Sequence, residues 1–172
     1  MRSVVLLRGI NVGRAKRIAM ADLRDLLAAL GYPDARTLLQ SGNAVVSGPP
    51  VDPATVELAI RARFGFDVRV FVRTRDELAG VVAANPLPVP DGARFLVSFL
   101  DRDPDPALLA PLDPEAYLPE RFAFGPRVAY LWCARGIIDS ALSGPLLRDL
   151  GVESTSRNWN TVTKLLELTG SG

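Results

Sequence analysis

The sequence contains no histidine and only one cysteine, and each absence excludes a class of chemistry. Without histidine, Ser-His-Asp and Cys-His mechanisms and histidine-ligated zinc are excluded. The single Cys133 excludes disulfides within the chain and CxxC sites, and its apolar neighbours in YLWC predict a buried thiol. The Walker A pattern GxxxxGK[ST] and the pattern GxGxxG are also missing. We therefore expect no metal and no cofactor, and a chemistry limited to carboxylates, amides, hydroxyls and Arg or Lys cations.

Long apolar runs and a strong net charge are missing as well. The apolar stretches fall far short of the ~20 residues that span a bilayer, and the amino terminus shows no signal-peptide pattern. A net charge of +1 gives no basic field for nucleic acid. We therefore expect a cytoplasmic protein with no membrane contact, without nucleic acid, and with a small anionic molecule as its partner. The sequence does not indicate an oligomeric state.

The first part of the chain predicts the element order β-α-β-β-α-β. The signals are short apolar runs for strands, leucines at helical spacing before Gly31, and an Asp-Pro start with a glycine end for the second helix. The right-handed crossover rule makes the first two strands parallel, with the third antiparallel between them. The expected elements are a strand at 3–7, a helix at 23–30, two strands within 37–47, a helix at 53–64 and a strand at 66–73.

The later part predicts a second set of helices and strands. Thr74 and Glu77 fit a capping box, and the helix that they begin should end before Asn85. The remaining expected elements are a strand at 95–100, a hairpin on either side of 125–126, and helical segments within 139–150 and 157–168. The fold class is therefore α+β, with a ferredoxin-like first subdomain at 1–73 packed on a smaller α+β subdomain at 74–172, whose C-terminal helix docks back.

Three polar stretches are candidates for a binding site. In the first, bare glycine backbone and cations before a helix can hold an anion. In the second, amides and a hydroxyl lie together at a hairpin tip. In the third, a helix carries polar residues at helical spacing, opposite an apolar stripe of Trp159, Val162, Leu165 and Leu166. Residues 154–156 are expected to cap that helix. The candidate ligand-binding residues are Arg8, Asn11, Gly13, Lys16, Gln40, Ser41, Asn43, Arg157, Asn160, Thr161 and Lys164.

Each stretch also has a purely structural interpretation. The glycines make a strand-to-helix turn with solvated charges, the hairpin tip is ordinary turn chemistry, and the helix is a capped amphipathic one. The topology nevertheless places the loop at 9–16 and the turn at 40–43 at the same end of the sheet. That placement favours a site over two unrelated turns.

The motifs resemble one bacterial family. LLRGINVG, M-x-x-L-R-x-L-L near LG, QSGN, NP and RNWNTV-x-KL occur in this order between residues 6 and 166. The chain is identified by them as a member of the family called domain of unknown function 1697. The resemblance implies a small cytoplasmic protein with two α+β subdomains, the first ferredoxin-like, and implies no activity. Members usually have glycine in place of Arg14 and an aromatic residue in place of Leu87, and the first departure argues against a phosphate cradle made of glycines alone.

Three functions stay open on the sequence. The first is a module that binds a small phosphorylated or nucleotide-like anion in a polar cleft between the subdomains. The second is a transferase or hydrolase in the same pocket, with Lys164 as its candidate catalytic proton-transfer group and Arg8 and Arg157 stabilising charge. The third is an interaction protein in which the polar stretches lock the two subdomains together through hydrogen bonds of amides and arginines.

Overall fold

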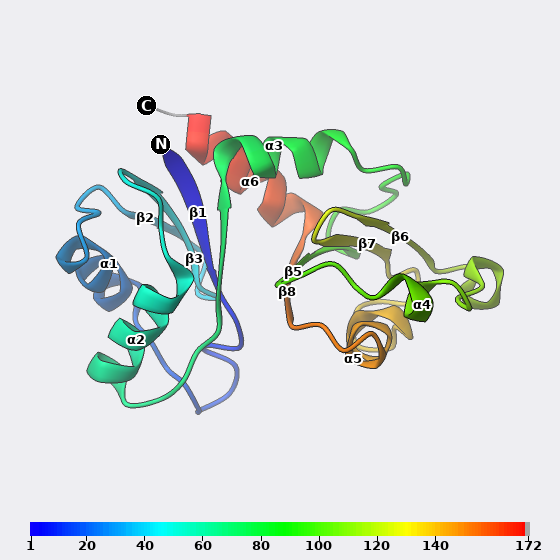
Figure 1. Ribbon diagram of the computed structural model, residues 1–172, viewed down its shortest axis with the longest axis horizontal. Coiled ribbons are helices and arrows are strands. Elements are labelled where there is room, and N and C mark those ends of the chain that lie inside the picture. The colour runs from blue at the N-terminus through cyan, green and yellow to red at the C-terminus, as the bar shows by residue number, and fades with distance from the viewer. Residues whose placement is uncertain (171–172) are drawn as a thin grey trace. The chain divides into compact units, whose positions relative to one another are not determined.

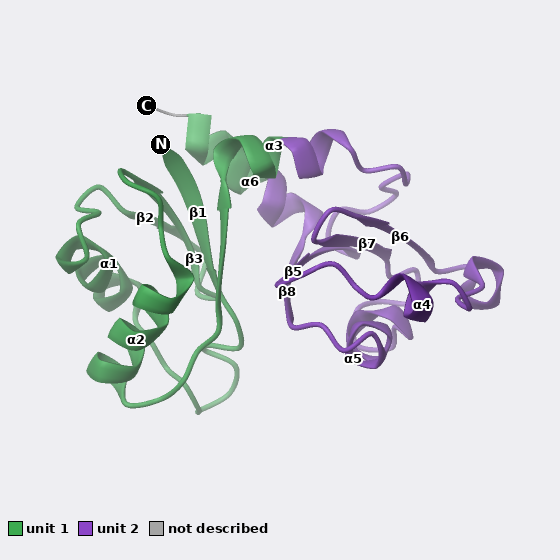
Figure 2. Ribbon diagram, in the orientation of Figure 1, with its two compact units in different colours: residues 1–79, 164–172 green, residues 80–163 purple. Residues whose placement is uncertain are grey.

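The computed structural model describes residues 1–170 and forms two compact units. Unit 1 comprises Met1–Ala79 and Lys164–Gly172, and unit 2 comprises Gly80–Thr163 (Figure 2). The sequence-based boundary at 73/74 falls before the last residue of strand β4 (Val70–Thr74), whereas the units divide inside helix α3 (Arg75–Ala83) and again inside helix α6 (Trp159–Gly170). Within residues 1–170, none of the helices has the length and apolar character needed to cross a lipid bilayer.

The predicted order β-α-β-β-α-β is confirmed in unit 1 (Figure 1). Its sheet, sheet A, has the strand order β2-β3-β1-β4, and every neighbouring pair is antiparallel. Strands β1 and β2 are therefore parallel to each other with β3 between them, as the crossover rule predicts. The elements are β1 (Arg2–Leu7), α1 (Met20–Ala29), β2 (Arg36–Leu38), β3 (Asn43–Ser47), α2 (Pro53–Phe64) and β4 (Val70–Thr74).

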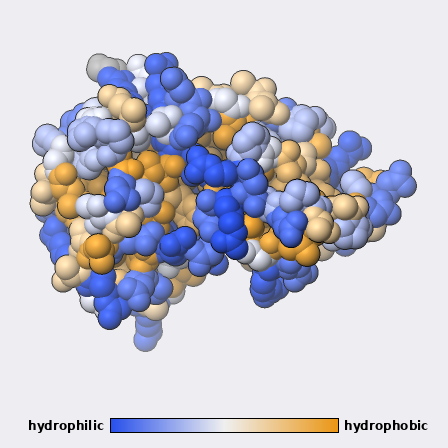
Figure 3. Space-filling model, viewed as in Figure 1, coloured by the Kyte–Doolittle hydropathy of each residue, from blue (hydrophilic) through white to orange (hydrophobic). Residues whose placement is uncertain are grey.

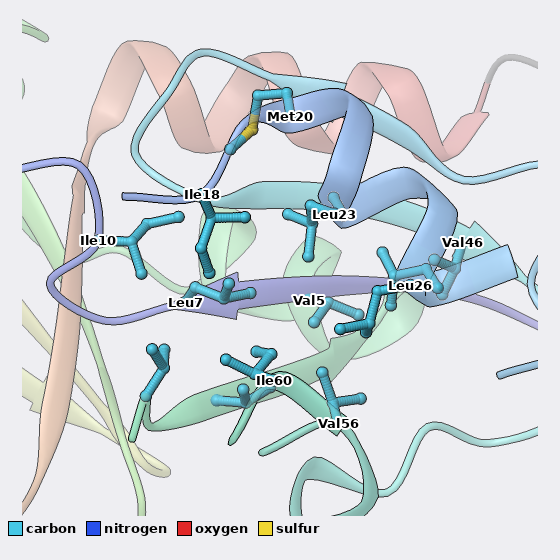
Figure 4. Close-up of a cluster of buried hydrophobic side chains, with 14 of the residues drawn as sticks. Val5, Leu7, Ile10, Ile18, Met20, Leu23, Leu26, Val46, Val56 and Ile60 are labelled. Atoms are coloured by element: carbon cyan, nitrogen blue, oxygen red, sulfur yellow. The ribbon is translucent and has the colours of Figure 1, made fainter. Parts of the chain in front are cut away.

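A core of apolar side chains fills the space between sheet A and helices α1 and α2 (Figure 4). Val5 and Leu7 of β1, Leu23 of α1 and Ile60 of α2 are each fully buried there. Burial of a side chain of this size contributes about 1.5–3 kcal/mol to stability. The leucine spacing that predicted α1 is thus the spacing of its core face.

The helix ends follow the local sequence signals. The carboxylate of Asp52 accepts a hydrogen bond from the Ala54 N–H at 3.1 Å, and Gly65 ends α2 with φ of +82°. Thr74 and Glu77 form the predicted capping box, because the Thr74 N–H donates to Glu77 Oε2 at 2.8 Å and the Glu77 N–H donates to Thr74 Oγ1 at 3.1 Å. These bonds satisfy amides that the helix itself leaves unpaired.

Two arginines of sheet A hold the last turn of α6. Arg2 Nη1 donates to the Thr169 carbonyl at 2.7 Å, and Arg36 Nη2 donates to the Leu168 carbonyl at 2.7 Å. Cations are favourable at this end of a helix, where carbonyl groups lack helical partners and the dipole is negative. The carboxyl-terminal part of α6 therefore belongs to unit 1.

The last strand of sheet A begins later than the sequence indicates. The alternation from Phe66 predicted a strand at 66–73, whereas β4 starts at Val70. Val70 pairs with Leu7, the last residue of β1, and one further bond joins Arg8 to Arg69, so residues 66–68 extend beyond the strand that could pair with them. Phe66 stacks on Phe64 instead, with ring centroids 6.1 Å apart.

Unit 2 contains a second antiparallel sheet, sheet B, with the strand order β6-β7-β5-β8. One face of this sheet packs on leucines from residues 142–150, and Cys133 is fully buried among them, as predicted. Burial is the main reason that the pKa of the Cys133 thiol is raised. The elements are β5 (Phe95–Leu100), α4 (Pro106–Leu109), η1 (Pro114–Tyr117), β6 (Arg121–Gly125), β7 (Val128–Trp132), η2 (Leu142–Leu146), α5 (Leu147–Asp149) and β8 (Ser154–Asn158).

The prediction for residues 154–158 was wrong. The sequence placed helix caps and the start of a helix there, but these residues form strand β8, which pairs with β5. Helix α6 begins only at Trp159, and its cap is Asn158, whose Oδ1 accepts from the Thr161 N–H at 2.9 Å. Trp159 is half-buried and makes an edge-to-face contact with Phe95, with ring centroids 5.5 Å apart.

Candidate functional site

The loop after β1 and the hairpin turn before β3 lie together at one end of sheet A, as predicted. The Leu7 N–H donates to the Gly42 carbonyl at 2.9 Å. The side-chain amide of Asn11 donates to the carbonyls of Gln40 at 2.7 Å and Ile18 at 2.8 Å. Its Oδ1 accepts from the Ile18 N–H at 2.8 Å. Asn11 therefore uses its amide to close the loop and to join it to the turn.

Asn43 has a similar internal role. Its side chain is fully buried, and its Nδ2 donates to the Leu38 carbonyl at 2.9 Å and to Ser41 Oγ at 3.0 Å. The turn places its positive φ angles at Leu39 and Gly42. The Asn43 amide and the Ser41 hydroxyl, which were predicted to face a ligand, thus bond within the turn, whereas Gln40 is exposed.

A cavity of about 540 Å³ opens beside the loop after β1. It lies within unit 1, between that loop, helix α2 and the residues that lead into β4. We call it the β1-end cavity. Its lining residues are Arg8, Gly9, Lys16, Glu57, Asp67, Val68 and Arg69.

Backbone pairing explains why these segments meet. The Arg8 N–H donates to the Arg69 carbonyl at 3.0 Å and extends the β1–β4 pairing by one bond beyond Leu7. Lys16 has φ of +51°, a sparsely populated conformation for a side chain of this kind, and its Nζ donates to the Asp67 carbonyl at 2.8 Å. The loop therefore folds back onto the segment before β4 and presents two cations to the cavity.

The charges of the cavity are only partly matched. The carboxylate of Asp67 pairs with Arg61 at 3.1 Å, and Glu57 Oε1 lies 3.8 Å from Arg69 Nη1. Arg8 is exposed, and within residues 1–170 its guanidinium has neither a hydrogen bond nor an ion pair. Lys16 bonds a neutral carbonyl. Two cations of the cavity thus lack a carboxylate partner in the described part of the chain.

The helix that follows the loop does not contribute to this cavity. Helix α1 begins at Met20 and has no side-chain cap, and no residue of α1 lines the cavity. Gly13 has φ of +66°, and its carbonyl accepts from Arg17 at 3.1 Å. From this loop, Arg8, Gly9 and Lys16 line the cavity, and Gly13 does not.

The third polar stretch is not the polar helix face that the sequence predicted. Arg157 lies on strand β8, and its Nη1 donates to Thr155 Oγ1 at 2.7 Å and to the Ser156 carbonyl at 2.9 Å. Burial lowers the pKa of Arg157 to about 10. Thr161 is also buried. The burial of Arg157 follows from the alternation of β8, in which Thr155 and Arg157 point to the same face of the strand, whereas Thr161 is a buried residue of α6.

The remaining candidates of this stretch are exposed on α6. Lys164 Nζ lies 3.4 Å from Glu167 Oε2 on the same helix, and Asn160 lies against Gly92 in unit 2. Neither residue lines the β1-end cavity. Arg157, Asn160 and Thr161 belong to unit 2 and the other candidates to unit 1, and the cleft expected between the subdomains stays a prediction.

Sequence reasoning missed three charged residues of the cavity, namely Glu57, Asp67 and Arg69. A signal for them was available. In the predicted order the last strand runs antiparallel beside the first, so the residues that lead into it must lie at the end of the first strand, beside Arg8. Only Glu57 needed more information, because its place depends on which face of α2 packs on the sheet.

Comparison with known proteins identifies a family and a fold. The model of a family described as "Protein of unknown function (DUF1697)" matches residues 1–130. A comparison with curated proteins finds no match. Among solved structures, the conserved bacterial protein SP0830 from Streptococcus pneumoniae matches with a TM-score of 0.73 and 22% identity, over 98% of each chain. At this identity, the likeness shows that the two chains share a fold.

Proposed function

We propose that unit 1 binds a small anion in the β1-end cavity. The chain belongs to the DUF1697 family, whose function is unknown. One observation carries the proposal: Arg8 and Lys16 line one cavity, and within residues 1–170 neither has a carboxylate partner. Phosphate and carboxylate groups are the usual partners of such cations, because charge-assisted hydrogen bonds are stronger than neutral ones.

The loop geometry supports the same function. Asn11 fixes the loop with three side-chain hydrogen bonds, so Arg8 and Lys16 start from an ordered backbone. Preorganisation of this kind lowers the entropic cost of binding. Both cations are exposed to solvent, where water and salt weaken electrostatic attraction. We therefore expect modest affinity, with a Kd on the order of 1 mM for inorganic phosphate, and weaker binding as ionic strength rises.

Titration of the protein with inorganic phosphate, followed by backbone amide NMR shifts, tests the proposal. We expect shifts at residues 8–16 and 66–70, and a loss of affinity of about tenfold in Arg8→Ala. Arg14→Ala is the matched control, because Arg14 is exposed in the same loop but does not line the cavity. Equal affinity of Arg8→Ala and the unmodified protein, or no shifts at 20-fold more phosphate than the expected Kd, would contradict it.

The polar stretches also have a structural role inside unit 1, which differs from the lock between subdomains that the sequence suggested. The Asn11 amide joins the loop to the hairpin turn, and the Asn43 amide, which is fully buried, holds the turn in shape. Asn43→Ala should therefore lower stability, by about 1–3 kcal/mol in urea unfolding, and leave phosphate affinity nearly unchanged. A large loss of phosphate affinity in a folded Asn43→Ala protein would assign this residue to the site instead.

The enzyme alternative remains a hypothesis based on Lys164. This residue pairs with Glu167 on the surface of α6 and lies outside the β1-end cavity. We therefore place binding before catalysis.

A further inference from the structure

We infer that the ligand of the β1-end cavity is a phosphate monoester that carries hydroxyl groups, such as a sugar phosphate, and not a bare anion. This inference rests on the proposed function. It comes from the volume of the cavity and from the carboxylates of Glu57 and Asp67, which line the cavity together with the cations Arg8 and Lys16.

The volume exceeds what a single anion needs. At about 540 Å³, the cavity lies within the range of ~300–1,000 Å³ that is usual for small-molecule sites. An inorganic phosphate ion held by Arg8 and Lys16 would leave most of this space to water. A ligand with a further polar body would fill it.

Glu57 supplies an acceptor that a bare anion cannot use. Its Oε1 accepts from the Val70 N–H at 3.1 Å and faces Arg69, so the carboxylate is fixed in direction. Its Oε2 has no hydrogen-bond partner within residues 1–170, although the residue lines the cavity. An ionised carboxylate accepts hydrogen bonds only, so the group that meets it must be a donor.

The charge around Glu57 favours a neutral donor over a cationic one. Arg69 lies 3.8 Å away and already offsets the negative charge of Glu57. A ligand hydroxyl adds a hydrogen bond without adding charge, whereas an ammonium group would compete with Arg69. The carboxylates of Glu57 and Asp67 repel the phosphate group of every such ligand, but a ligand hydroxyl that donates to Glu57 offsets this repulsion, whereas an anion without hydroxyl groups gains nothing in return.

The test compares three phosphate monoesters by calorimetric titration of the full chain. Methyl phosphate has no hydroxyl group on its organic part, glucose 6-phosphate has several, and 2-aminoethyl phosphate has an ammonium group instead. We expect glucose 6-phosphate to bind about tenfold more tightly than methyl phosphate, and 2-aminoethyl phosphate to bind more weakly than glucose 6-phosphate.

Two variants of Glu57 locate the preference. Glu57→Ala removes the acceptor and should reduce the tenfold ratio to less than threefold. Glu57→Gln keeps an oxygen for the Val70 N–H and removes the negative charge. It should therefore raise the affinity for methyl phosphate and reduce the affinity ratio between glucose 6-phosphate and methyl phosphate. This variant provides the test if Glu57→Ala fails to fold. Asp76→Asn, which neutralises a carboxylate of unit 1 outside this cavity, is the control and should leave the ratio unchanged.

The outcomes separate this inference from the proposal on which it rests. If all three esters bind with equal affinity and Arg8→Ala weakens them all, the anion site stands and the hydroxyl preference is wrong. Tightest binding of 2-aminoethyl phosphate, or an unchanged ratio in a folded Glu57 variant, would also overturn the preference. If none of the esters binds, both the site and the preference fall.

Discussion

Gly42 lies where the hairpin turn of sheet A meets β1, and the lack of a side chain allows that approach. Its φ is +90°, and a Cβ atom there would lie 2.8 Å from Leu7 Cβ and 3.0 Å from Ile10 Cδ1. These neighbours belong to the core of unit 1, where close packing leaves little room to shift. The joint between turn and strand therefore depends on this single glycine.

We expect Gly42→Ala to destabilise the protein by about 2–4 kcal/mol, from backbone strain together with overpacking. Gly13→Ala is the matched control, since its φ is +66° and nothing lies within 4 Å of the added Cβ. Strain alone should cost about 1 kcal/mol there. Urea unfolding measures the loss of unfolding free energy in each of the two variants. Equal losses in the two variants would show that packing at Gly42 contributes nothing.

Residue type was a better guide to location than to role. The sequence placed Asn11 and Asn43 at one end of the sheet, and the structure confirms that location. Their amides were predicted to face a ligand, but both are bonded within the loop and turn, because a buried or half-buried amide must find partners. The cations Arg8 and Lys16 do line a cavity. Which polar groups remain available to a ligand depends on hydrogen bonds between segments far apart in the sequence. The spacing of residues along the chain does not predict these bonds.

Among the elements, helices and apolar strands followed from pattern, and the polar strand β8 did not. Caps, apolar spacing and glycine ends are local signals, which is why α1, α2 and α3 lie where the sequence placed them. In β8, Thr155 and Arg157 are buried and their neighbours are half-buried, so the strand has the expected period of two. Its buried members are polar, and hydrophobic alternation could not reveal them.

Helix α6 is held at its end by arginines from two different strands. Arg36 donates to the Leu168 carbonyl, so Arg36→Ala should raise hydrogen-exchange rates in the last turn of α6 by about three- to tenfold, because a charge-assisted bond at a helix end contributes about 1 kcal/mol. Arg148→Ala, on α5 of unit 2, is the control. Exchange measured by NMR should be unchanged in the control; unchanged exchange in Arg36→Ala would mean that Arg2 alone suffices.

At the scale of the whole molecule, each unit has its own sheet and its own core. Sheet A packs on α1 and α2, and sheet B packs on the leucines of residues 142–150. The fold class and the first sheet's topology were predictable because most of their contacts join segments with strong local signals. The division inside α3 and α6 was not, because a helix that runs through a boundary shows no break in composition.

A substitution in one core should therefore lower the stability mainly of the unit that contains it. Leu131 is fully buried in the core of unit 2, and Leu131→Ala should cost about 2–5 kcal/mol. We expect amide protection to fall in β5 and β7 and to persist in β1 and β3, as measured by hydrogen exchange. An equal loss of protection in both sheets would show instead that the two units unfold as one.

The chain passes from unit 1 to unit 2 inside α3 and returns to unit 1 inside α6, so the two units are completed at different times during synthesis. Unit 2 is one uninterrupted stretch, Gly80–Thr163, whereas unit 1 draws on residues both before and after that stretch. As the polypeptide leaves the ribosome, sheet A is made before unit 2, yet the turn of α6 that Arg2 and Arg36 bond is translated after unit 2. Unit 1 can therefore be completed only after all of unit 2 has been synthesised.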